Sequence, residues 1–253
     1  MIMPTNAFKA AIRAGRAQIG IWNTIPGPVV IEVLAGAGFD VVVIDTEHSL
    51  TDVPDVMAML QALAAYPVAS AVRAASNDPV LIKRLLDIGA QTLIIPYVQN
   101  ADEARAAVRA MRYAPRGFRG VSAATRAARY GAVADYIQTA EAELCLIVQV
   151  ETGAALAEIE AIAAVDGVDM IFIGPSDLAA SMGHPGQLGH PQVKAAVEDA
   201  IRRIVAAGKP AAVLTLDPDF ARHCMAAGST FTVVAVDIPE LSKAAKAAAA
   251  AFR

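Results

Sequence analysis

Residues 39–64 read FDVVVIDTEHSLTDVPDVMAMLQALA, and this stretch decides the fold that the sequence predicts. Residues 39–45 are a nearly continuous run of Val and Ile, which is typical of a strand covered on both faces in a parallel sheet. Residues 53–64 have a proline in the first turn, which indicates a helix. The stretch is therefore one strand followed by one helix, the repeating unit of a parallel α/β fold.

The same unit recurs along the whole chain. The predicted strands are Gln18–Asn23, Phe39–Asp45, Val68–Arg73, Thr92–Val98, Leu144–Glu151, Met170–Gly174, Ala211–Thr215 and Phe231–Asp237. The predicted helices are Pro28–Ala37, Val53–Ala64, Pro79–Ile88, Ala101–Arg112, Gly153–Ala164, Pro191–Ala207, Pro218–Ala227 and Pro239–Phe252. Eight strands, each followed by a helix, predict a (β/α)8 barrel, with residues 1–253 as a single domain. An open doubly wound sheet is the alternative, but no G-x-G-x-x-G motif opens a helix and eight near-equal units favour closure.

Composition and charge argue against several classes of protein. The chain has 253 residues, 21 basic and 25 acidic side chains, and a net charge of -4. This mild acidity argues against nucleic-acid binding, and no stretch is long and apolar enough to span a membrane. Lys9, Arg13 and Arg16 precede any long apolar run, so we see no secretory signal. Because Cys145 and Cys224 lie in apolar surroundings without metal-type spacing, we expect a soluble cytoplasmic protein.

Polar side chains gather at the predicted strand ends, where the active sites of such barrels lie. In chain order they are Trp22, Asn23, Asp45, Glu47, His48, Arg73, Gln149, Glu151, Ser176, Asp177 and Asp237. A hydrophobic core alone does not require so many ionisable groups at these positions. The sequence therefore predicts an active site at the carboxyl end of the barrel.

Glu151 and Asp177 follow neighbouring strands, so their carboxylates are expected to converge. Two such carboxylates repel unless a proton or a cation lies between them, and oxygen ligands suit Mg²⁺ or Mn²⁺. Gly174 turns the chain into a short helix whose amides at Ser176 and Asp177 could hold a carboxylate. Gln149 points to the same side of its strand as Glu151. The alternative is that Glu151 caps the next helix and that Ser176 caps the helix containing Asp177.

His48 and Arg73 are candidate catalytic residues. An imidazole at a strand end is a suitable general base near neutral pH, and its neighbours Asp45 and Glu47 in DTEH favour catalysis over a structural role. Arg73 ends an apolar strand, and a buried guanidinium requires an anion, either a neighbouring acid or charge that develops in a reaction. A salt bridge from Arg73 to Asp45 or Glu47 is the structural alternative, and both roles can coexist.

Two missing features, a strand-end lysine and a glycine-rich phosphate site, limit the reactions and substrates that we expect, and one connection is unusually long. No lysine ends a predicted strand, which argues against Schiff-base catalysis. The turns TLDPDF and VDIPE after the last two strands lack the glycines of a barrel phosphate site, which argues against a phosphate-ester substrate. The connection Tyr113–Gly131 contains four Arg residues, and a loop of this length is usually functional or mobile.

Five motifs in order resemble the HpcH/HpaI aldolase family, the metal-dependent class II pyruvate aldolases typified by 4-hydroxy-2-oxoheptanedioate aldolase and 2-dehydro-3-deoxyglucarate aldolase. They are LAGAGFDVVVIDTEHS (34–49), VRAASNDPVLIKRLLDIGAQTLIIPYVQNADEA (72–104), APRGFRGVS (114–122), VQVETGAAL (148–156) and VDMIFIGPSDLAASMG (168–183). The resemblance extends from about Gly20 to Ala250. It is highly specific for the family and less specific for the substrate.

The resemblance implies a role for each matching residue. His48 would be the proton acceptor, Arg73 the enolate stabiliser, Glu151 and Asp177 the metal ligands, and Gln149 with the amides of Ser176 and Asp177 the contacts to the pyruvyl carboxylate. We place Asp45 in the catalytic group, and Trp22 and Gly174 beside the substrate. The expected cofactor is Mg²⁺, Mn²⁺ or Co²⁺, with no organic cofactor.

Asp87 corresponds in the resemblance to an acid that raises the basicity of the histidine. The predicted fold puts Asp87 at the end of a helix, on the face of the barrel opposite His48. It could reach a histidine only in a neighbouring subunit, so the resemblance implies a homo-oligomer with shared sites, a trimer of dimers in this family. Thr46, Val41 and Ser176 depart from residues common in the family, which affects acceptor specificity more than chemistry.

We therefore expect reversible aldol cleavage of a 4-hydroxy-2-oxo acid to pyruvate, or a related 2-oxo acid, and an aldehyde. A malyl-CoA-type lyase is the alternative enzyme, and it would need a basic groove made from Arg116, Arg119, Arg126 and Arg129. A catalytically silent metal-binding barrel is the alternative from another class. A complete set of acid, base and anion-stabilising groups favours the aldolase.

Overall fold

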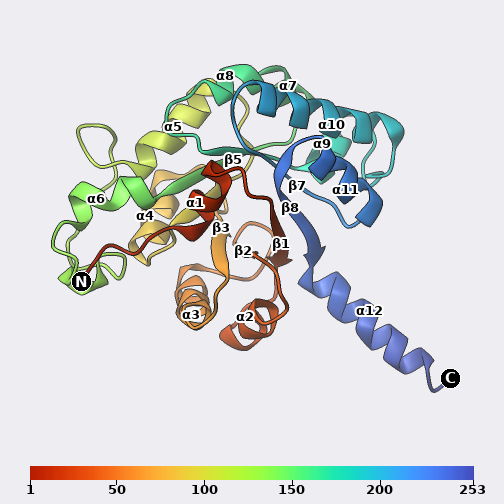
Figure 1. Cartoon of the computed structure of the whole chain (residues 1–253), viewed down its shortest axis with the longest axis horizontal. Helices are drawn as coiled ribbons and strands as arrows, with labels where there is room; N and C mark the ends of the chain where they lie inside the picture. Colours follow the sequence, from red (N-terminus) through yellow and green to blue (C-terminus); the bar gives the residue numbers. More distant parts are fainter.

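The strands of the computed structural model, which describes residues 1–253, close into a parallel barrel in chain order (Figure 1). They are β1 (Gln18–Asn23), β2 (Val41–Asp45), β3 (Ala69–Arg73), β4 (Thr92–Ile95), β5 (Cys145–Val150), β6 (Met170–Ile173), β7 (Ala211–Leu214) and β8 (Ser229–Val236). Parallel pairing of β8 with β1 closes the barrel. The predicted (β/α)8 barrel is confirmed, and the open-sheet alternative is wrong.

Helices surround the barrel and begin at the residues that local chemistry favours. They are α1 (Ala7–Arg13), α2 (Pro28–Ala35), α3 (Val53–Leu63), α4 (Pro79–Asp87), α5 (Ala101–Met111), α6 (Tyr136–Glu143), α7 (Gly153–Ala157), α8 (Ile159–Ala163), α9 (Pro175–Ser181), α10 (Pro191–Ala206), α11 (Pro218–Ala226) and α12 (Asp237–Ala250). Asp52, Asp78 and Asp217 each precede a helix with proline in its first turn and accept hydrogen bonds from its free amides.

Several elements differ from the predicted ones for local reasons. The helix predicted over residues 153–164 is split at Glu158 into α7 and α8. The strand predicted to reach Val98 ends at Ile95, because Pro96 has no amide hydrogen for the ladder. Tyr97 then adopts a left-handed backbone with φ of 55°. Helices α1 and α6 were not predicted, since both are short and weakly patterned.

Helix α1 closes the amino end of the barrel. Phe8 and Ile12 insert into an interior cluster that includes Phe172 and Phe231. The rings of Phe8 and Phe231 meet edge to face with centroids 5.1 Å apart. The Lys9 ammonium donates to the Leu144 carbonyl and is therefore satisfied although buried. With this end filled, the interior is accessible to a ligand only from the opposite end.

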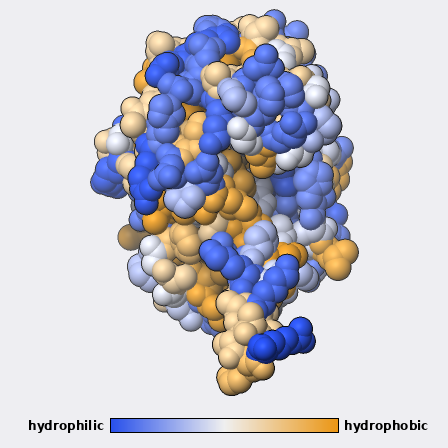
Figure 2. Space-filling view, turned by 90° about the vertical axis from the view of Figure 1, so that its right-hand side faces the viewer, coloured by the Kyte–Doolittle hydropathy of each residue, from blue (hydrophilic) through white to orange (hydrophobic).

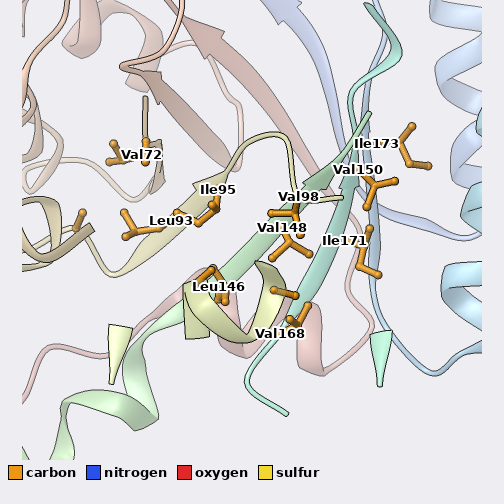
Figure 3. Packing of buried hydrophobic residues seen from close by; sticks show 14 of the residues in the cluster. Val72, Leu93, Ile95, Val98, Leu146, Val148, Val150, Val168, Ile171 and Ile173 are labelled. Atoms are coloured by element: carbon orange, nitrogen blue, oxygen red, sulfur yellow. The ribbon is translucent and has the colours of Figure 1, made fainter. Parts of the chain in front are cut away.

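A larger core fills the space between the strands and the helices outside them. Figure 3 shows part of it, with Leu93 and Ile95 of β4 beside Val148 of β5 and Ile171 of β6. Other residues of these strands point into the barrel, so both faces are buried. This double burial explains why the strand sequences are continuous rather than alternating.

Helix α12 leaves the barrel instead of packing along it (Figure 1). Only its first residue, Asp237, is buried, while Ile238 and Leu241 are exposed. Figure 2 shows apolar surface in the middle of the face from which the C-terminal end projects. The eighth helix therefore leaves its own barrel incompletely covered. None of the helices has the length and apolarity that a transmembrane span requires.

Candidate active site

A cavity of about 550 Å³ opens at the carboxyl ends of the strands. The predicted residues that line it are Trp22, Asp45, His48, Arg73, Gln149, Gly174, Ser176 and Asp177. They come from strands or loops far apart in the sequence, and barrel closure brings them together. The Tyr113–Gly131 connection contributes no lining residue.

Arg73 is clamped at the end of β3 by groups from β1 and β2. Its Nε and Nη2 donate to the two oxygens of Asp45 at 2.8 and 2.6 Å, and its Nη1 lies 2.8 Å from Glu47 Oε2. The guanidinium carbon lies 4.7 Å from the ring centre of Trp22. The Trp22 indole N–H also donates to Asp45, at 3.2 Å. The predicted salt bridge is therefore present, and it fixes the orientation of the planar cation.

The pKa values of Asp45 and Glu47, the two acids beside Arg73, are shifted in opposite directions. Burial raises the pKa of Asp45, but the hydrogen bonds and charge of Arg73 outweigh it, so the net pKa lies below its ordinary value. For Glu47, burial dominates over the Arg73 charge and the pKa is raised. Asp45 is therefore the permanent counter-ion of Arg73.

Asp45 also organises the loop that carries His48. Its Oδ1 accepts from the backbone N–H groups of Glu47 and His48, at 3.0 and 3.4 Å. Thr46 Oγ1 donates to the carbonyl of Arg73 at 2.6 Å and ties the loop to β3. The imidazole of His48 lines the same cavity as Arg73. The DTEH segment is thus a turn that is held by hydrogen bonds to the Asp45 carboxylate.

Glu151 lies at the end of β5 and is 2% exposed. Its Oε2 accepts from Gln149 Nε2 at 2.6 Å and its Oε1 accepts from the Tyr97 amide at 2.7 Å. Burial, with only partial compensation by the Tyr97 amide, and the nearby charges of Asp177 and Glu47 raise its pKa to about 7. Gln149 Oε1 is buried and has no hydrogen-bond partner. Buried polar atoms are normally paired, so this region is open to a ligand.

Gly174 leaves the space in which this pair sits. A Cβ at Gly174 would lie 2.3 Å from Glu151 Oε2 and 2.7 Å from Gln149 Nε2. Helix α9 begins directly afterwards, with Asp177 in its first turn. Ser176 is inside the helix rather than capping it, and Thr152, not Glu151, caps α7. The capping roles considered as the alternative for Ser176 and Glu151 are therefore wrong.

Five of the candidate residues do not line the cavity, and they are Asn23, Glu47, Asp87, Glu151 and Asp237. Glu47 and Glu151 contact the lining residues Arg73 and Gln149, whereas the other three are engaged elsewhere. Asn23 Nδ2 donates to Asp237 Oδ2 at 2.8 Å, and the Asp237 carboxylate also accepts from the amides of Thr24 and Ile25. This pair braces the β1–α2 connection. Asp87 ends α4, next to the amino end of β4, and accepts from Arg119 Nη2 at 2.8 Å.

The sequence did not identify the outer wall of the cavity. This wall consists of Leu188, Val193, Lys194, Val197, Leu214, Leu216, Asp217 and Phe220. Lys194 lies in a helix, as expected, but its side chain reaches the cavity. The signal was weak because these residues come from α10 and the loop before it and from the end of β7 through the start of α11, where apolar and charged residues are ordinary.

The donor set includes too few ligands to be recognised as a complete metal site. No group of three or more His, Cys, Asp or Glu side chains is arranged so that it could hold a metal ion. Glu151 and Asp177 could supply two oxygens, and the remaining positions of a divalent ion would then belong to water and substrate.

Comparison with known proteins places the chain in a family. The model of the HpcH/HpaI aldolase/citrate lyase family matches residues 18–244. A pyruvate aldolase of Rhizobium etli is 58% identical over 252 residues, covering 100% of this chain and 99% of that protein. A 4-hydroxy-2-oxo-heptane-1,7-dioate aldolase of Klebsiella pneumoniae is 52% identical, covering 98% and 94%.

A solved structure supports the same conclusion. The crystal structure of an HpcH/HpaI aldolase/citrate lyase family protein from Burkholderia cenocepacia superimposes with a TM-score of 0.94 at 39% identity. The match covers 98% of this chain and 100% of that one. The chain therefore belongs to the HpcH/HpaI aldolase/citrate lyase family and is an aldolase of that family.

Proposed function

We propose that this chain is a divalent-metal-dependent class II aldolase that reversibly cleaves 4-hydroxy-2-oxo acids to pyruvate, or a related 2-oxo acid, and an aldehyde. The observation that carries the proposal is one cavity that contains a clamped guanidinium at Arg73, an imidazole at His48 and the carboxylate of Asp177, with that of Glu151 at its edge. The names of the Rhizobium and Klebsiella relatives support the same reaction.

Glu151 and Asp177 would hold the metal, with Mg²⁺, Mn²⁺ or Co²⁺ as the candidates. The donor set fits, because burial and the neighbouring acids Asp177 and Glu47 make the ionised form of Glu151 unfavourable without a cation. Gly174, which lacks a side chain, lets Glu151 and Gln149 occupy the space beside α9, and the buried Gln149 Oε1 next to Glu151 has no hydrogen-bond partner. When bound, the ion would supply Lewis-acid stabilisation of negative charge on the 2-oxo oxygen.

Side chains and backbone amides of the chain would carry out proton transfer, charge stabilisation and substrate orientation. In cleavage, His48 accepts the proton of the 4-hydroxyl group as the C3–C4 bond breaks, and protonation of the enolate at C3 gives pyruvate. In the reverse aldol addition, pyruvate loses a C3 proton, the C3–C4 bond forms, and His48 returns the proton to the new 4-hydroxyl group. Arg73 stabilises the charge that develops on pyruvate, because it cannot lose its proton and Asp45 holds it in one orientation. Gln149 and the amides of Ser176 and Asp177 orient the carboxylate end of the substrate. The ring of Trp22 lies against the Arg73 guanidinium.

We further propose a homo-oligomer in which Asp87 of one subunit faces His48 of another. Within one chain the two residues lie at opposite ends of the barrel. Asp87 Oδ1 is engaged by Arg119, but Oδ2 accepts no hydrogen bond, and the side chain is 25% exposed. One carboxylate oxygen is therefore free for a partner subunit. A carboxylate beside an imidazole would raise its basicity.

Helix α12 supports assembly by an independent argument. It leaves Ile238 and Leu241 exposed, while Val29 and Val33 of α2 are also exposed. A barrel with an uncovered apolar stripe and a detached helix can complete itself with the α12 of a second copy. Reciprocal exchange would bury both surfaces, and a trimer of such dimers is the proposed assembly.

We infer that the reaction uses no organic cofactor and takes place in the cytoplasm. An aldol step involves no net oxidation or reduction, so a base, a cation and a Lewis acid suffice. Cys145 and Cys224 are free and buried, which suits a reducing compartment.

The alternative of a CoA-thioester lyase lacks the basic groove it needs. Arg119 is fully buried and paired with Asp87, and Arg116 is paired with Glu141. Arg126 donates to the Ile88 carbonyl, and neither it nor Arg129 lines the strand-end cavity. These contacts favour a small aldehyde over a CoA ester.

A donor and acceptor screen with and without chelator tests the proposal. We expect aldol products from pyruvate and aldehydes, loss of activity in EDTA, and recovery with Mg²⁺, Mn²⁺ or Co²⁺. Borohydride should trap no pyruvate adduct. His48→Ala should slow exchange of the pyruvate methyl protons. Full activity in EDTA, or a borohydride-trapped adduct, would overturn the metal-dependent mechanism.

A further inference from the structure

The outer wall of the cavity contains an ion pair that the proposed chemistry does not use. Lys194 Nζ, from α10, lies 2.7 Å from Asp217 Oδ2 in the β7–α11 connection. Both side chains are partly exposed, at 34% and 46%, and both line the cavity. The pair therefore borders the entrance through which a second substrate must pass.

Local contacts hold the pair in a defined position. Asp217 Oδ1 caps α11 by accepting from the amides of Asp219 and Phe220, at 3.0 and 3.1 Å, and its other oxygen binds Lys194. The Lys194 ammonium also lies 4.8 Å from the ring centre of Phe220. The lysine is thus fixed by a carboxylate on one side and an aromatic face on another.

Lys194 is the one Lys or Arg residue of the cavity lining to which the proposed pyruvate chemistry assigns no role. Arg73 and Lys194 are the only Lys or Arg residues that line it, and Arg73 is engaged by Asp45 and Glu47. An ammonium group has three donors, and Asp217 uses one. Around the pair, Leu188, Leu216 and Phe220 provide apolar surface. Thr215 also lines the cavity and accepts from the Asp217 amide at 3.3 Å, so Lys194 and Asp217 are the charged groups that a polar group on the far end of an aldehyde would meet on this wall.

We propose that the Lys194–Asp217 pair determines acceptor specificity and selects aldehydes with an uncharged hydroxyl group at their distal end. This inference rests on the proposed aldol function. A hydroxyl both accepts and donates, so it can accept from Lys194 and donate to Asp217. A distal carboxylate would also be attracted by Lys194, but Asp217 beside it would repel the second negative charge. Lys194 is 34% exposed, so water binds its spare donors, and a purely apolar aldehyde would displace that water without offering a hydrogen bond in return.

Two variants separate the two members of the pair. Lys194→Met removes the donor but keeps an unbranched chain. Asp217→Asn removes the negative charge while keeping a good helix cap, because Asn and Asp cap equally well. Arg105→Met, on α5 and outside the cavity lining, removes one positive charge as Lys194→Met does and serves as the control.

The readout is a ratio of kcat/KM values within each variant, so differences in the amount of active protein cancel. The matched aldehydes are glyceraldehyde against propanal, and succinic semialdehyde against butanal, each with pyruvate as donor. We expect Lys194→Met to lower the glyceraldehyde preference about tenfold to a hundredfold, the worth of a hydrogen bond to a charged group. Asp217→Asn should raise the succinic semialdehyde preference about tenfold, and Arg105→Met should change neither ratio.

The outcomes also distinguish this inference from the function on which it rests. Exchange of the pyruvate methyl protons by the wild-type protein requires no aldehyde, and its absence together with absent aldol products would refute the proposed function. Wild-type exchange and aldol addition, with both aldehyde ratios unchanged in Lys194→Met and Asp217→Asn, would refute the role of the ion pair alone.

Discussion

Arg73 shows how one residue sets the charge balance of the site. Its guanidinium is shared between Asp45 and Glu47, and the Glu151 and Asp177 carboxylates lie close enough to affect the same charges. With all four acids ionised, negative charge exceeds positive charge around the cavity. The site therefore favours a cation, and Arg73 is oriented by Asp45 before any substrate arrives.

Arg73→Lys should slow exchange of the pyruvate methyl protons by roughly 10²–10³-fold, comparable to removal of one charge-stabilising donor. Lysine keeps the charge but cannot make the two-pronged contact with Asp45. Exchange followed by NMR measures the effect. Arg105→Lys is the control, because Arg105 makes only an exposed i,i+3 pair with Asp102. A wild-type exchange rate in Arg73→Lys would contradict the assigned role.

Glu151 should make the metal-free protein sensitive to pH. Its folded-state pKa of about 7 lies above the ordinary value of 4.5, so the folded state binds this proton more tightly than the unfolded state. The resulting stability is fully present below pH 4.5 and is lost as the pH rises to about 7. The decrease is on the order of 3 kcal/mol, since one pKa unit corresponds to about 1.4 kcal/mol.

Urea unfolding in EDTA across this range measures the effect. Glu151→Gln removes the titrating group, so its stability curve should lack this component and diverge from that of the wild type. Adding Mg²⁺ should reverse most of the wild-type loss, because a ligand of the ionised form stabilises the folded state. Parallel curves for the two proteins in EDTA would contradict the raised pKa.

The rule that active sites lie at strand ends anticipated eight of the 22 residues that line the cavity, and its failures have physical causes. His48, Arg73 and Asp177 were identifiable because parallel strands present their carboxyl ends to one face. Tyr97 was not, because it contributes a backbone amide to Glu151 from a left-handed conformation, which no side-chain pattern reveals. Asn23 and Asp237 satisfied the same rule but bind each other.

At the scale of elements, the start of α9 positions the proposed metal ligands. Gly174 follows β6 and is the N-cap residue of α9, so the turn brings Asp177 to the cavity while leaving space for Glu151. The sequence predicted this short helix because Gly-Pro marks a turn and a helix start. It did not predict α1, since the seven residues of α1 gain their stability from burial of Phe8 and Ile12 in the barrel.

Gly174→Ala should impair the site without unfolding the barrel. The new Cβ would lie 2.3 Å from Glu151 Oε2, so the carboxylate must move. We expect weaker Mg²⁺ or Mn²⁺ binding by calorimetry and at least a tenfold loss of aldol activity, given the sensitivity of catalysis to misplacement of about 1 Å. Gly153→Ala, whose Cβ would meet nothing within 4 Å, is the matched control. Equal metal affinity in both variants would disprove the packing argument.

At the scale of the whole molecule, the two ends of the barrel have different tasks. The carboxyl end holds the cavity, while α1 and the ends of the helices occupy the other. Asp87 and His48 are separated by the length of the strands, and α12 leaves a gap in its own helix layer. Both features support the proposed homo-oligomer with shared sites. Asp87 entered the candidate site through the resemblance alone, because a contact between subunits would leave no periodic pattern in one chain.

Subunit complementation tests the shared site directly. Asp87→Asn and His48→Ala should each lower turnover in separate preparations while leaving metal binding intact. Mixed subunits would form some interfaces that pair a native His48 with a native Asp87, and random pairing would restore up to about a quarter of wild-type activity. Native mass spectrometry must first establish that subunits exchange.

The complementation result separates a shared site from a structural role of Asp87. Asp87 also holds the buried Arg119, so Asp87→Asn could lower activity by disturbing its own subunit. Such a defect would stay with the altered chain, and adding His48→Ala subunits would not repair it. Only a site built from two chains recovers on mixing. Exchanged hybrids without recovery, or a fully active monomer, would show that Asp87 acts within its own barrel.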